Sequence, residues 1–515
     1  MPPSSSQNLA ATLHPRAAAR HIALWLFATF QFFYLATSTG RVRTADEYNT
    51  LYTTESLVLH GTTAVPQAVA LHNFYGRYDV HGQPRAAYPP GQAIACAPWY
   101  ALGQYVIARL PGVPGDDTDL IVAFTSTLSS ATFAALTVTF FFLLLEAIAV
   151  PRPAALMATA MLGLATPSFA YSAWLFSEPL SAVIFTISAW ILFAPPRTAP
   201  LRTTLALSRA ASAGVLLGLA TLVRPTNILA VAIFAVAILA SHGKAAFRAV
   251  MIFGACAAIG VAVLLAHNAI LFGSPLAFGY PTSAEGAKQL NHFDTPLLTG
   301  LYGFLFSPGK SLFIFAPPAV LAIFGIPALW RVSRGLATLA ILLPLVDLFF
   351  FAKYSQWEGG YCVGPRYLVP ALVFLCLGLG PALLQNQAES RIRLKTIAAV
   401  LLGLGFLVQA VSLATSFMED QVPRGRYYGA NWTYRLDYSL SGPIHLFWKY
   451  LTSSQPARLG LGWDRWFVFL AKAGVSRATL AVFGAVIVVG LAISLVGLSK
   501  SVALAHGESS FQNQA

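Results

Sequence analysis

The chain has 515 residues, of which 57% are hydrophobic and only 10% are charged, and its mean hydropathy is +0.65. Soluble domains usually carry about 25% charged residues, so this composition excludes a soluble protein and predicts a membrane protein. The net charge of +13 would suggest nucleic acid on a soluble chain, but in a membrane protein it is expected in the loops that set orientation, so no nucleic-acid partner is expected. Four cysteines without a metal-binding spacing argue against a disulfide scaffold or a zinc domain.

Apolar runs of membrane-crossing length recur along the chain and predict an all-α polytopic membrane protein. The first run lacks a small-residue cleavage site, so we expect an anchor and not a signal peptide. We expect about twelve spans, near residues 21–38, 120–147, 154–172, 179–194, 209–223, 226–241, 249–271, 311–330, 336–352, 367–384, 396–417 and 477–498.

Residues 92–109 could form a thirteenth span. With twelve spans and both termini in the cytoplasm, the short loops rich in Lys and Arg all lie inside, as the positive-inside rule requires. Counting residues 92–109 as a span would place those loops outside. We therefore expect an amphipathic helix on the outer interface, with Trp99, Tyr100 and Tyr105 in the headgroup layer.

This topology divides the chain into a membrane core, outer segments and two tails. Besides 39–119 and 418–476, a substantial outer segment is expected at residues 272–310 and a shorter one at 353–366. The main divisions are a cytoplasmic tail (1–20), a transmembrane core (21–417) that includes a first outer loop (39–119), an outer loop region (418–476), a last transmembrane helix (477–498) and a cytoplasmic tail (499–515).

Acidic residues are scarce, so their positions are informative. Asp46 and Glu47 follow the first span closely and form a carboxylate pair at the outer surface, where they are either a solvated pair or helix cap, or part of a reaction site. Residues 48–59 after them are typical of a short interfacial helix. Glu178 lies at the outer mouth of the fourth span and is either a capping residue or a ligand of sugar hydroxyls. Asp347 lies inside the ninth span, where it could pair with a cation of the bundle.

Five basic residues lie at outer span edges, where they bind either lipid headgroups or a fixed phosphate. Lys310 follows the tight turn Ser307-Pro308-Gly309, and Arg366 follows Gly364-Pro365. Such turns let backbone N–H groups approach an anion, and Arg can grip phosphate with two N–H groups. The five candidates are Arg85, Arg224, Lys310, Lys353 and Arg366.

One outer segment combines aromatic and acidic side chains. Trp357 and Tyr361 could stack on sugar rings, and Glu358 could hold sugar hydroxyls. The alternative is a belt of interfacial aromatic residues.

The order of these features resembles the GT-C glycosyltransferases. The resemblance rests on the Asp-Glu pair after the first span, on the helix led by Pro89-Pro90, and on the segments NAILFGSPLAFGY (268–280), FSPGKSLFIFAPP (306–318) and WEGGYCVGPRYLVP (357–370). The resemblance covers roughly residues 20–385. Within this class, the chain is similar to the protein O-mannosyltransferases and to the bacterial aminoarabinose transferases that modify lipid A. The fold that it implies is a GT-C bundle whose outer loops carry interfacial helices.

The resemblance also implies a chemistry. The donor would be a sugar on a polyprenyl monophosphate, and an acceptor hydroxyl on a glycan, lipid or protein would attack the anomeric carbon with inversion. Asp46 would be the base, and Glu47 would orient Asp46 or the acceptor. The phosphate would be bound by Lys310, Arg366, Arg85, Arg224 and Lys353, and the sugar or acceptor by Glu178, Trp357, Glu358 and Tyr361.

No cofactor or metal is expected, because Arg and Lys can neutralise a monophosphate. One position departs from the aminoarabinose transferases, which carry Lys before the Pro-Pro pair where this chain has Tyr88. Arg85, three residues earlier, is the candidate replacement.

The expected location is the bacterial inner membrane, with the active site facing outward and with membrane lipids as partners. Two other functions remain open. One is a lipid or sugar transporter or flippase, although transporters usually show repeats and ionisable residues at mid-span. The other is an O-antigen ligase or polymerase, which the late outer loop 418–476 would suit.

Overall fold

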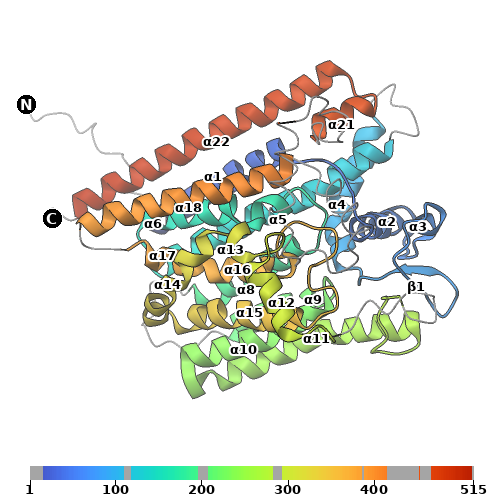
Figure 1. Ribbon diagram of the computed structural model, residues 1–515, viewed down its shortest axis with the longest axis horizontal. Coiled ribbons are helices and arrows are strands. Elements are labelled where there is room, and N and C mark those ends of the chain that lie inside the picture. Colours follow the sequence, from blue (N-terminus) through green and yellow to red (C-terminus); the bar gives the residue numbers. More distant parts are fainter. Residues whose placement is uncertain are drawn as a thin grey trace, which may run out of the picture.

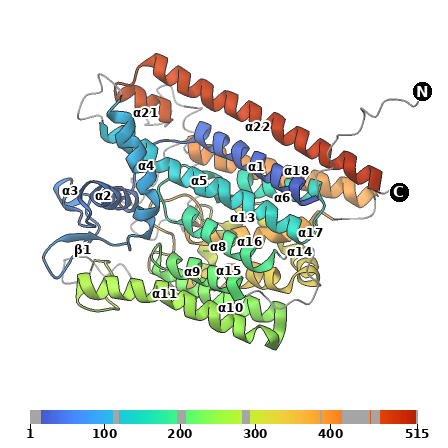
Figure 2. The same cartoon turned by 180° about the vertical axis from the view of Figure 1, so that it is seen from behind.

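The structure is a computed structural model that describes residues 15–109, 118–194, 207–281, 293–384, 388–414, 452 and 465–512. Its helices form an elongated bundle, with α2, α3 and β1 projecting at one end and α22 running along one side next to α1 (Figures 1 and 2). The helices are α1 (Pro15–Thr37), α2 (Ala45–His60), α3 (Pro66–Ala70), α4 (Gly91–Ile107), α5 (Thr118–Ala147), α6 (Arg152–Ala165), α7 (Pro167–Tyr171), α8 (Glu178–Phe193), α9 (Leu207–Ala220), α10 (Ile228–His242), α11 (Phe247–Phe272), α12 (Leu297–Phe306), α13 (Leu312–Phe315), α14 (Pro318–Val332), α15 (Arg334–Ala352), α16 (Val369–Leu375), α17 (Leu379–Ala382), α18 (Ala388–Ala414), α21 (Trp466–Lys472) and α22 (Arg477–Gln512).

The fold is that of an all-α polytopic membrane protein, as expected. Five helices in the described ranges are long and apolar enough to cross a membrane, and shorter apolar helices accompany them. In α11 and α22 only 28% and 11% of the most apolar stretch is buried, so their remaining apolar surface is available to lipid. The five long segments are Asp119–Ala147, Phe247–Phe272, Arg334–Ala352, Ile392–Ala414 and Arg477–Leu504.

Proline residues break two of the expected spans. The expected span 154–172 is divided into α6 and α7 at Thr166, before Pro167. The expected span 311–330 is divided between α13 and α14, where Pro317 and Pro318 interrupt the helix. Proline lacks an N–H and clashes with the preceding turn, so it starts a new helix more readily than it continues one.

Several elements of the outer segments were not expected, and they include α3 and α21. A short antiparallel ribbon joins β1 (Gly76–Tyr78) to β2 (Pro84–Ala86), with Arg77 opposite Arg85. Helix α12 lies in the segment expected to be a plain outer loop. The ribbon strands are too short to give an alternating pattern, whereas α12 is an apolar run of ten residues, too short to be expected as a membrane span.

The first outer loop is fixed to the bundle by close backbone contacts. Helix α4 covers residues 92–107 of the ambiguous segment and packs across α5. A Cβ on Gly103 of α4 would lie 2.3 Å from Oγ1 of Thr125, and one on Gly91 would lie 2.5 Å from the carbonyl oxygen of Leu222. These glycines let α4 approach the bundle more closely than any larger residue would.

The loop region 418–476 is described only in part. Apart from residue 452, residues 418–464 lie outside the described residues. Residues 465 and 466 contact the bundle, where Arg465 Nη1 donates to the carbonyl of Thr37 at 2.9 Å and Trp466 packs on Phe124. Helix α21 therefore lies at the end of the bundle where α1 ends.

Candidate functional site

Arg366 joins two carboxylates from distant parts of the chain. Its Nη1 donates to Oδ2 of Asp46 at 2.5 Å, and its Nε donates to Oε1 of Glu178 at 2.7 Å. Arg224 Nη1 donates to the same Glu178 oxygen at 2.7 Å. These four residues, which we call the ion cluster, contain two cations and two anions, so their buried charges compensate one another.

Each member of the ion cluster lies at the start or end of a helix. Asp46 lies in the first turn of α2 and Glu178 is the first residue of α8, where helix dipoles favour negative charge. Arg224 precedes the 3-10 turn η2 (Pro225–Asn227), and Arg366 begins the 3-10 turn η5 (Arg366–Leu368). The site is therefore built where several helices meet at one end of the bundle.

The ion cluster keeps unused acceptor atoms. The side chain of Glu178 is fully buried, and within the described part of the chain its Oε2 has no hydrogen-bond partner. Asp46 is 23% exposed, and among the described residues no hydrogen bond is recorded to its Oδ1. An unpaired carboxylate oxygen of this kind can accept a proton or a hydroxyl group from a ligand.

Tyrosines surround the ion cluster. Tyr88 packs against Tyr75 and Tyr280, with ring centroids 6.2 and 5.9 Å apart. Tyr354 packs against Tyr367, whose ring lies 5.2 Å from the Arg224 guanidinium. Burial raises the pKa of Tyr88 well above its ordinary value, and the charge of Asp46 adds to this, so the phenol stays protonated and can donate.

Glu47 contacts the backbone and not the ion cluster. Its Oε2 accepts from the N–H groups of Arg43 and Thr44 and from the Thr44 hydroxyl, and its Oε1 accepts from the N–H of Leu175 at 3.0 Å. Burial raises the pKa of the Glu47 carboxyl, although Arg43 and these N–H groups lower it. Glu47 therefore caps α2 and ties it to the loop before α8.

Lys310 is also bound within the protein. Its buried Nζ donates to the carbonyl of Cys362 at 2.8 Å, to Sγ of Cys362 at 3.1 Å and to the carbonyl of Gly360 at 3.4 Å. These bonds fix the turn that leads to Arg366. Burial raises the pKa of the neighbouring Glu358 to about 7, against the lowering effect of Lys310.

The remaining expected site residues lie around this end of the bundle but outside the ion cluster. Arg85 binds Asp79 through Nε and Nη2, each at 2.8 Å, and Thr63 through Nη1 at 2.8 Å. Trp357 is buried against Phe304, and Tyr361 is 40% exposed. Lys353 is partly exposed at the end of α15 and has no recorded side-chain partner in the described ranges.

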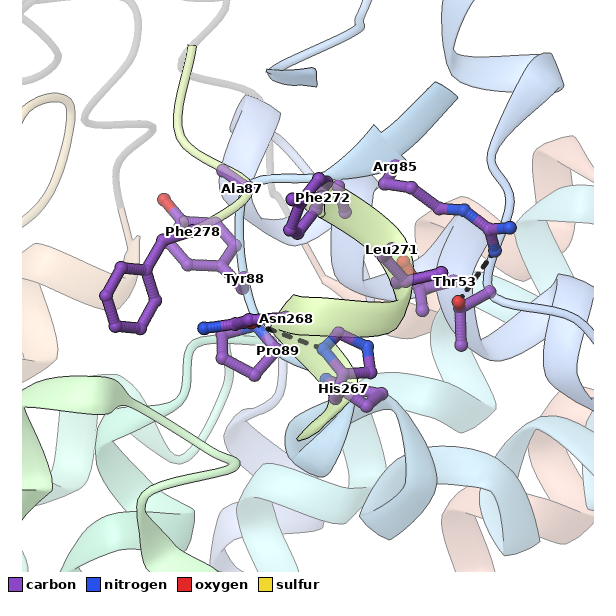
Figure 3. Close-up of a pocket in the computed structure, with 14 residues that line it drawn as sticks. Thr53, Arg85, Ala87, Tyr88, Pro89, His267, Asn268, Leu271, Phe272 and Phe278 are labelled. Atoms are coloured by element: carbon purple, nitrogen blue, oxygen red, sulfur yellow. Dashed lines mark hydrogen bonds between the residues drawn. The ribbon is translucent and has the colours of Figure 1, made fainter. Parts of the chain in front are cut away.

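A narrow cleft connects Arg85 with Tyr88. Figure 3 shows Arg85 and Thr53 at one end of this cleft and Tyr88 and Phe278 at the other, with His267 between them. A second, apolar cavity of about 480 Å³ lies among α12 to α16. It is lined by Leu305, Leu312, Phe313, Ile323, Ile326, Pro327, Ala340, Ile341, Pro344, Leu345, Leu348, Leu368, Leu372 and Leu375.

The sequence singled out all four members of the ion cluster, but it missed part of the tyrosine surround. Tyr75, Tyr280 and Tyr367 were not predicted as site residues. Tyr280 ends the segment 268–280 and Tyr367 follows Arg366, so their places in the two family-like segments were the available signal. In the described residues no group of three His, Cys, Asp or Glu side chains is placed to hold a metal ion.

Several chains in solved structures are similar to this chain. One such similarity is to the crystal structure of ArnT from Cupriavidus metallidurans bound to undecaprenyl phosphate, with 14% sequence identity and a TM-score of 0.46. It covers 95% of this chain and 75% of that chain. No family model and no curated protein sequence matches the chain.

Proposed function

We propose that the protein is an inverting membrane glycosyltransferase of the GT-C type, with about twelve spans and both termini in the cytoplasm. It transfers a sugar from a polyprenyl monophosphate to an acceptor hydroxyl at the outer face of the bacterial inner membrane. The observation that carries this proposal is the Asp46–Arg366 ion pair, which lies next to Arg224 at one end of an apolar bundle.

Asp46 is the proposed base. Arg366 holds Oδ2, and Oδ1 can take the proton of the acceptor hydroxyl as its oxygen attacks the anomeric carbon. The bond between that carbon and the phosphate oxygen breaks, and the polyprenyl phosphate leaves with the electron pair. A carboxylate positioned in this way typically accelerates a reaction by about 10²–10⁴.

Arg366 and Arg224 are the proposed cations for the leaving phosphate. Both donate to one Glu178 oxygen, and each guanidinium has further N–H groups for phosphate oxygens. Glu178 balances their charge when no donor is bound. Phenols such as Tyr88 can add neutral hydrogen bonds. Arg85, Lys353 and Lys310 remain candidates for outer phosphate contacts, with Lys310 acting through the turn that it fixes.

The apolar cavity is the proposed site of the donor's lipid tail. Its lining residues Leu368 and Leu372 follow Arg366 in the chain, and Leu312 follows Lys310. An apolar cavity that begins beside paired guanidinium groups suits a phosphate that carries a hydrocarbon chain. Glu178, Trp357, Glu358 and Tyr361 are the proposed contacts of the sugar or of the acceptor.

The test uses the purified protein in lipid vesicles. Native mass spectrometry of the co-purified lipid identifies the donor, and transfer from the radiolabelled donor is then measured. We expect Asp46→Asn to lower the transfer rate by about 10²–10⁴ while the lipid still co-purifies. The matched control Asp119→Asn changes an exposed outer acid and is expected to transfer normally. Transfer is expected to continue in EDTA.

Three results would contradict the proposal. The first is normal transfer by Asp46→Asn. The second is movement of the intact lipid across the bilayer without cleavage of its sugar, which would indicate a flippase. The third is a strict requirement for a pyrophosphate-linked glycan, which would indicate a ligase or polymerase.

A further inference from the structure

A second polar cleft lies in the first outer loop, beyond the ion cluster. Its volume is about 480 Å³, and it is formed by the C-terminal half of α2, the following loop, α3 and the turn of the β ribbon. We call it the outer-loop cleft. It is lined by Glu55, Ser56, His60, Thr62, Ala64, Pro66, Gln67 and Gln83.

The lining combines fixed hydrogen-bonding groups of several kinds. Gln67 Nε2 donates to the carbonyl of Tyr52 at 3.1 Å, to the Ser56 hydroxyl at 3.2 Å and to Oε2 of Glu55 at 3.3 Å. The amide is thereby held in place, and its oxygen remains an acceptor. With one carboxylate, two amides, two hydroxyls and an imidazole, the cleft offers both donors and acceptors at short spacing.

The charge of the cleft disfavours an anionic ligand. The lining contains one carboxylate, that of Glu55, and no Lys or Arg. The guanidinium of Arg85 donates to the Thr62 hydroxyl at 3.4 Å and is already paired with Asp79. A phosphate or a carboxylate would find no Lys or Arg among the lining residues and would face Glu55, whereas a neutral polyhydroxyl group would meet suitable donors and acceptors.

Helix α2 connects the cleft to the proposed base. Asp46, Thr53 and His60 follow one another at seven-residue intervals, so they lie near one face of the helix. Thr53 lines the narrow cleft of Figure 3 together with Tyr88, and His60 lines the outer-loop cleft. The helix rise places His60 about 21 Å along the axis from Asp46.

We propose that the outer-loop cleft binds a neutral sugar residue of an oligosaccharide acceptor, at a distance from the sugar whose hydroxyl Asp46 deprotonates. This inference rests on the proposed function. The separation between the cleft and Asp46 requires an acceptor that extends over more than one sugar residue.

The experiment uses membranes from cells that make the full chain, supplied with the radiolabelled polyprenyl-phosphate sugar. The readout is the ratio of label transferred to the cell's own acceptor to label released as free sugar by hydrolysis. We expect Gln83→Ala and Glu55→Gln each to lower this ratio roughly tenfold, as expected from losing substrate hydrogen bonds. The control Gln104→Leu removes an equivalent side-chain amide from α4 and is expected to leave the ratio unchanged.

A chemical test of the labelled product accompanies the ratio. The labelled product is expected to resist proteinase K, because the acceptor is a glycan and not a protein. Gln83 is exposed and no side-chain bond is recorded for it among the described residues, so its truncation keeps the fold.

Unchanged ratios in both cleft variants, or label released as glycopeptides, would overturn the inference about the outer-loop cleft. The proposed function would still stand if donor cleavage depends on Asp46. A wild-type protein that never cleaves the donor, in contrast, would remove the proposed function itself.

Discussion

At Arg366, one guanidinium binds carboxylates that lie 320 and 188 residues away in the chain. Its ring contacts are equally close, with Phe176 4.1 Å from the guanidinium carbon. A planar group with several fixed N–H donors can hold Asp46 and Glu178 at once. Lysine, which is a compact point charge on a flexible stem, cannot reproduce this geometry.

We expect Arg366→Lys to reduce transfer by at least about 10², because one ammonium group cannot hold Asp46 and Glu178 at once and also bind the proposed donor phosphate. Stability should also fall by roughly 3–5 kcal/mol, since Glu178 is left partly uncompensated. Transfer assays and thermal unfolding in detergent measure the two effects. The control Arg331→Lys changes an exposed residue at the end of α14 and should alter neither. Full activity in Arg366→Lys would contradict the proposed role of the guanidinium in holding both carboxylates.

The residue types of the site were predictable, but their partners were not. The scarcity of acids made Asp46 and Glu178 conspicuous, and span edges identified Arg224 and Arg366. That Glu178 binds both arginines, and that Lys310 binds the carbonyl of Cys362, depends on contacts between distant segments. Such contacts between distant segments cannot be predicted from the local sequence.

At the scale of elements, helix α2 carries Asp46, the proposed base. The sequence predicted a short helix over residues 48–59, whereas α2 begins at Ala45. The capping box formed by Thr44 and Glu47 explains the earlier start, since it satisfies the first N–H groups of the helix. The helix was therefore predictable in kind, and its first turn follows a recognisable motif.

Thr44→Ala should destabilise the protein by about 1 kcal/mol and lower the turnover rate more than donor affinity, because the first turn of α2 holds Asp46. Thr44→Ser should restore both. Ser476→Ala provides the matched control, as Ser476 caps the N-terminus of α22 by accepting from the N–H of Thr479. Equal losses of turnover in Thr44→Ala and Ser476→Ala would argue against a specific effect on the base.

At the scale of the whole molecule, the bundle has two distinct ends. The ion cluster, α2 and α21 lie at one end. At the other, a Cβ on Gly335 would touch Phe193 and Ser241, which lie near the ends of α8 and α10. Helix α15 has 19 residues and separates these ends by about 28 Å, close to the thickness of a bilayer's hydrocarbon core.

This polarity gives a labelling prediction. A membrane-impermeant maleimide should label His81→Cys in intact cells, since His81 is exposed in the turn of the β ribbon. Arg331→Cys should be labelled only after permeabilisation. The wild-type chain is the control, because Cys96, Cys362 and Cys376 are buried and the partly buried Cys256 lies within the apolar helix α11. The opposite pattern would invert the proposed orientation.

The presence and order of most membrane helices were predictable from the apolar runs, because a helix that crosses a bilayer must be apolar. The breaks before Pro167 and Pro318 and the packing of α9 on α11 were not predicted. In that packing a Cβ on Gly260 would lie 2.1 Å from the backbone of Gly218. Such contacts depend on which helices become neighbours.

The order of the ion cluster along the chain has a consequence for biosynthesis. Glu178 is made before both of its partners, and Arg366 is made long after Arg224, by roughly ten seconds or more at ordinary translation rates. Until then a nascent chain holds Asp46 without its guanidinium. The ion cluster is therefore complete only late in membrane insertion, and we expect truncated products that end before Arg366 to be inactive.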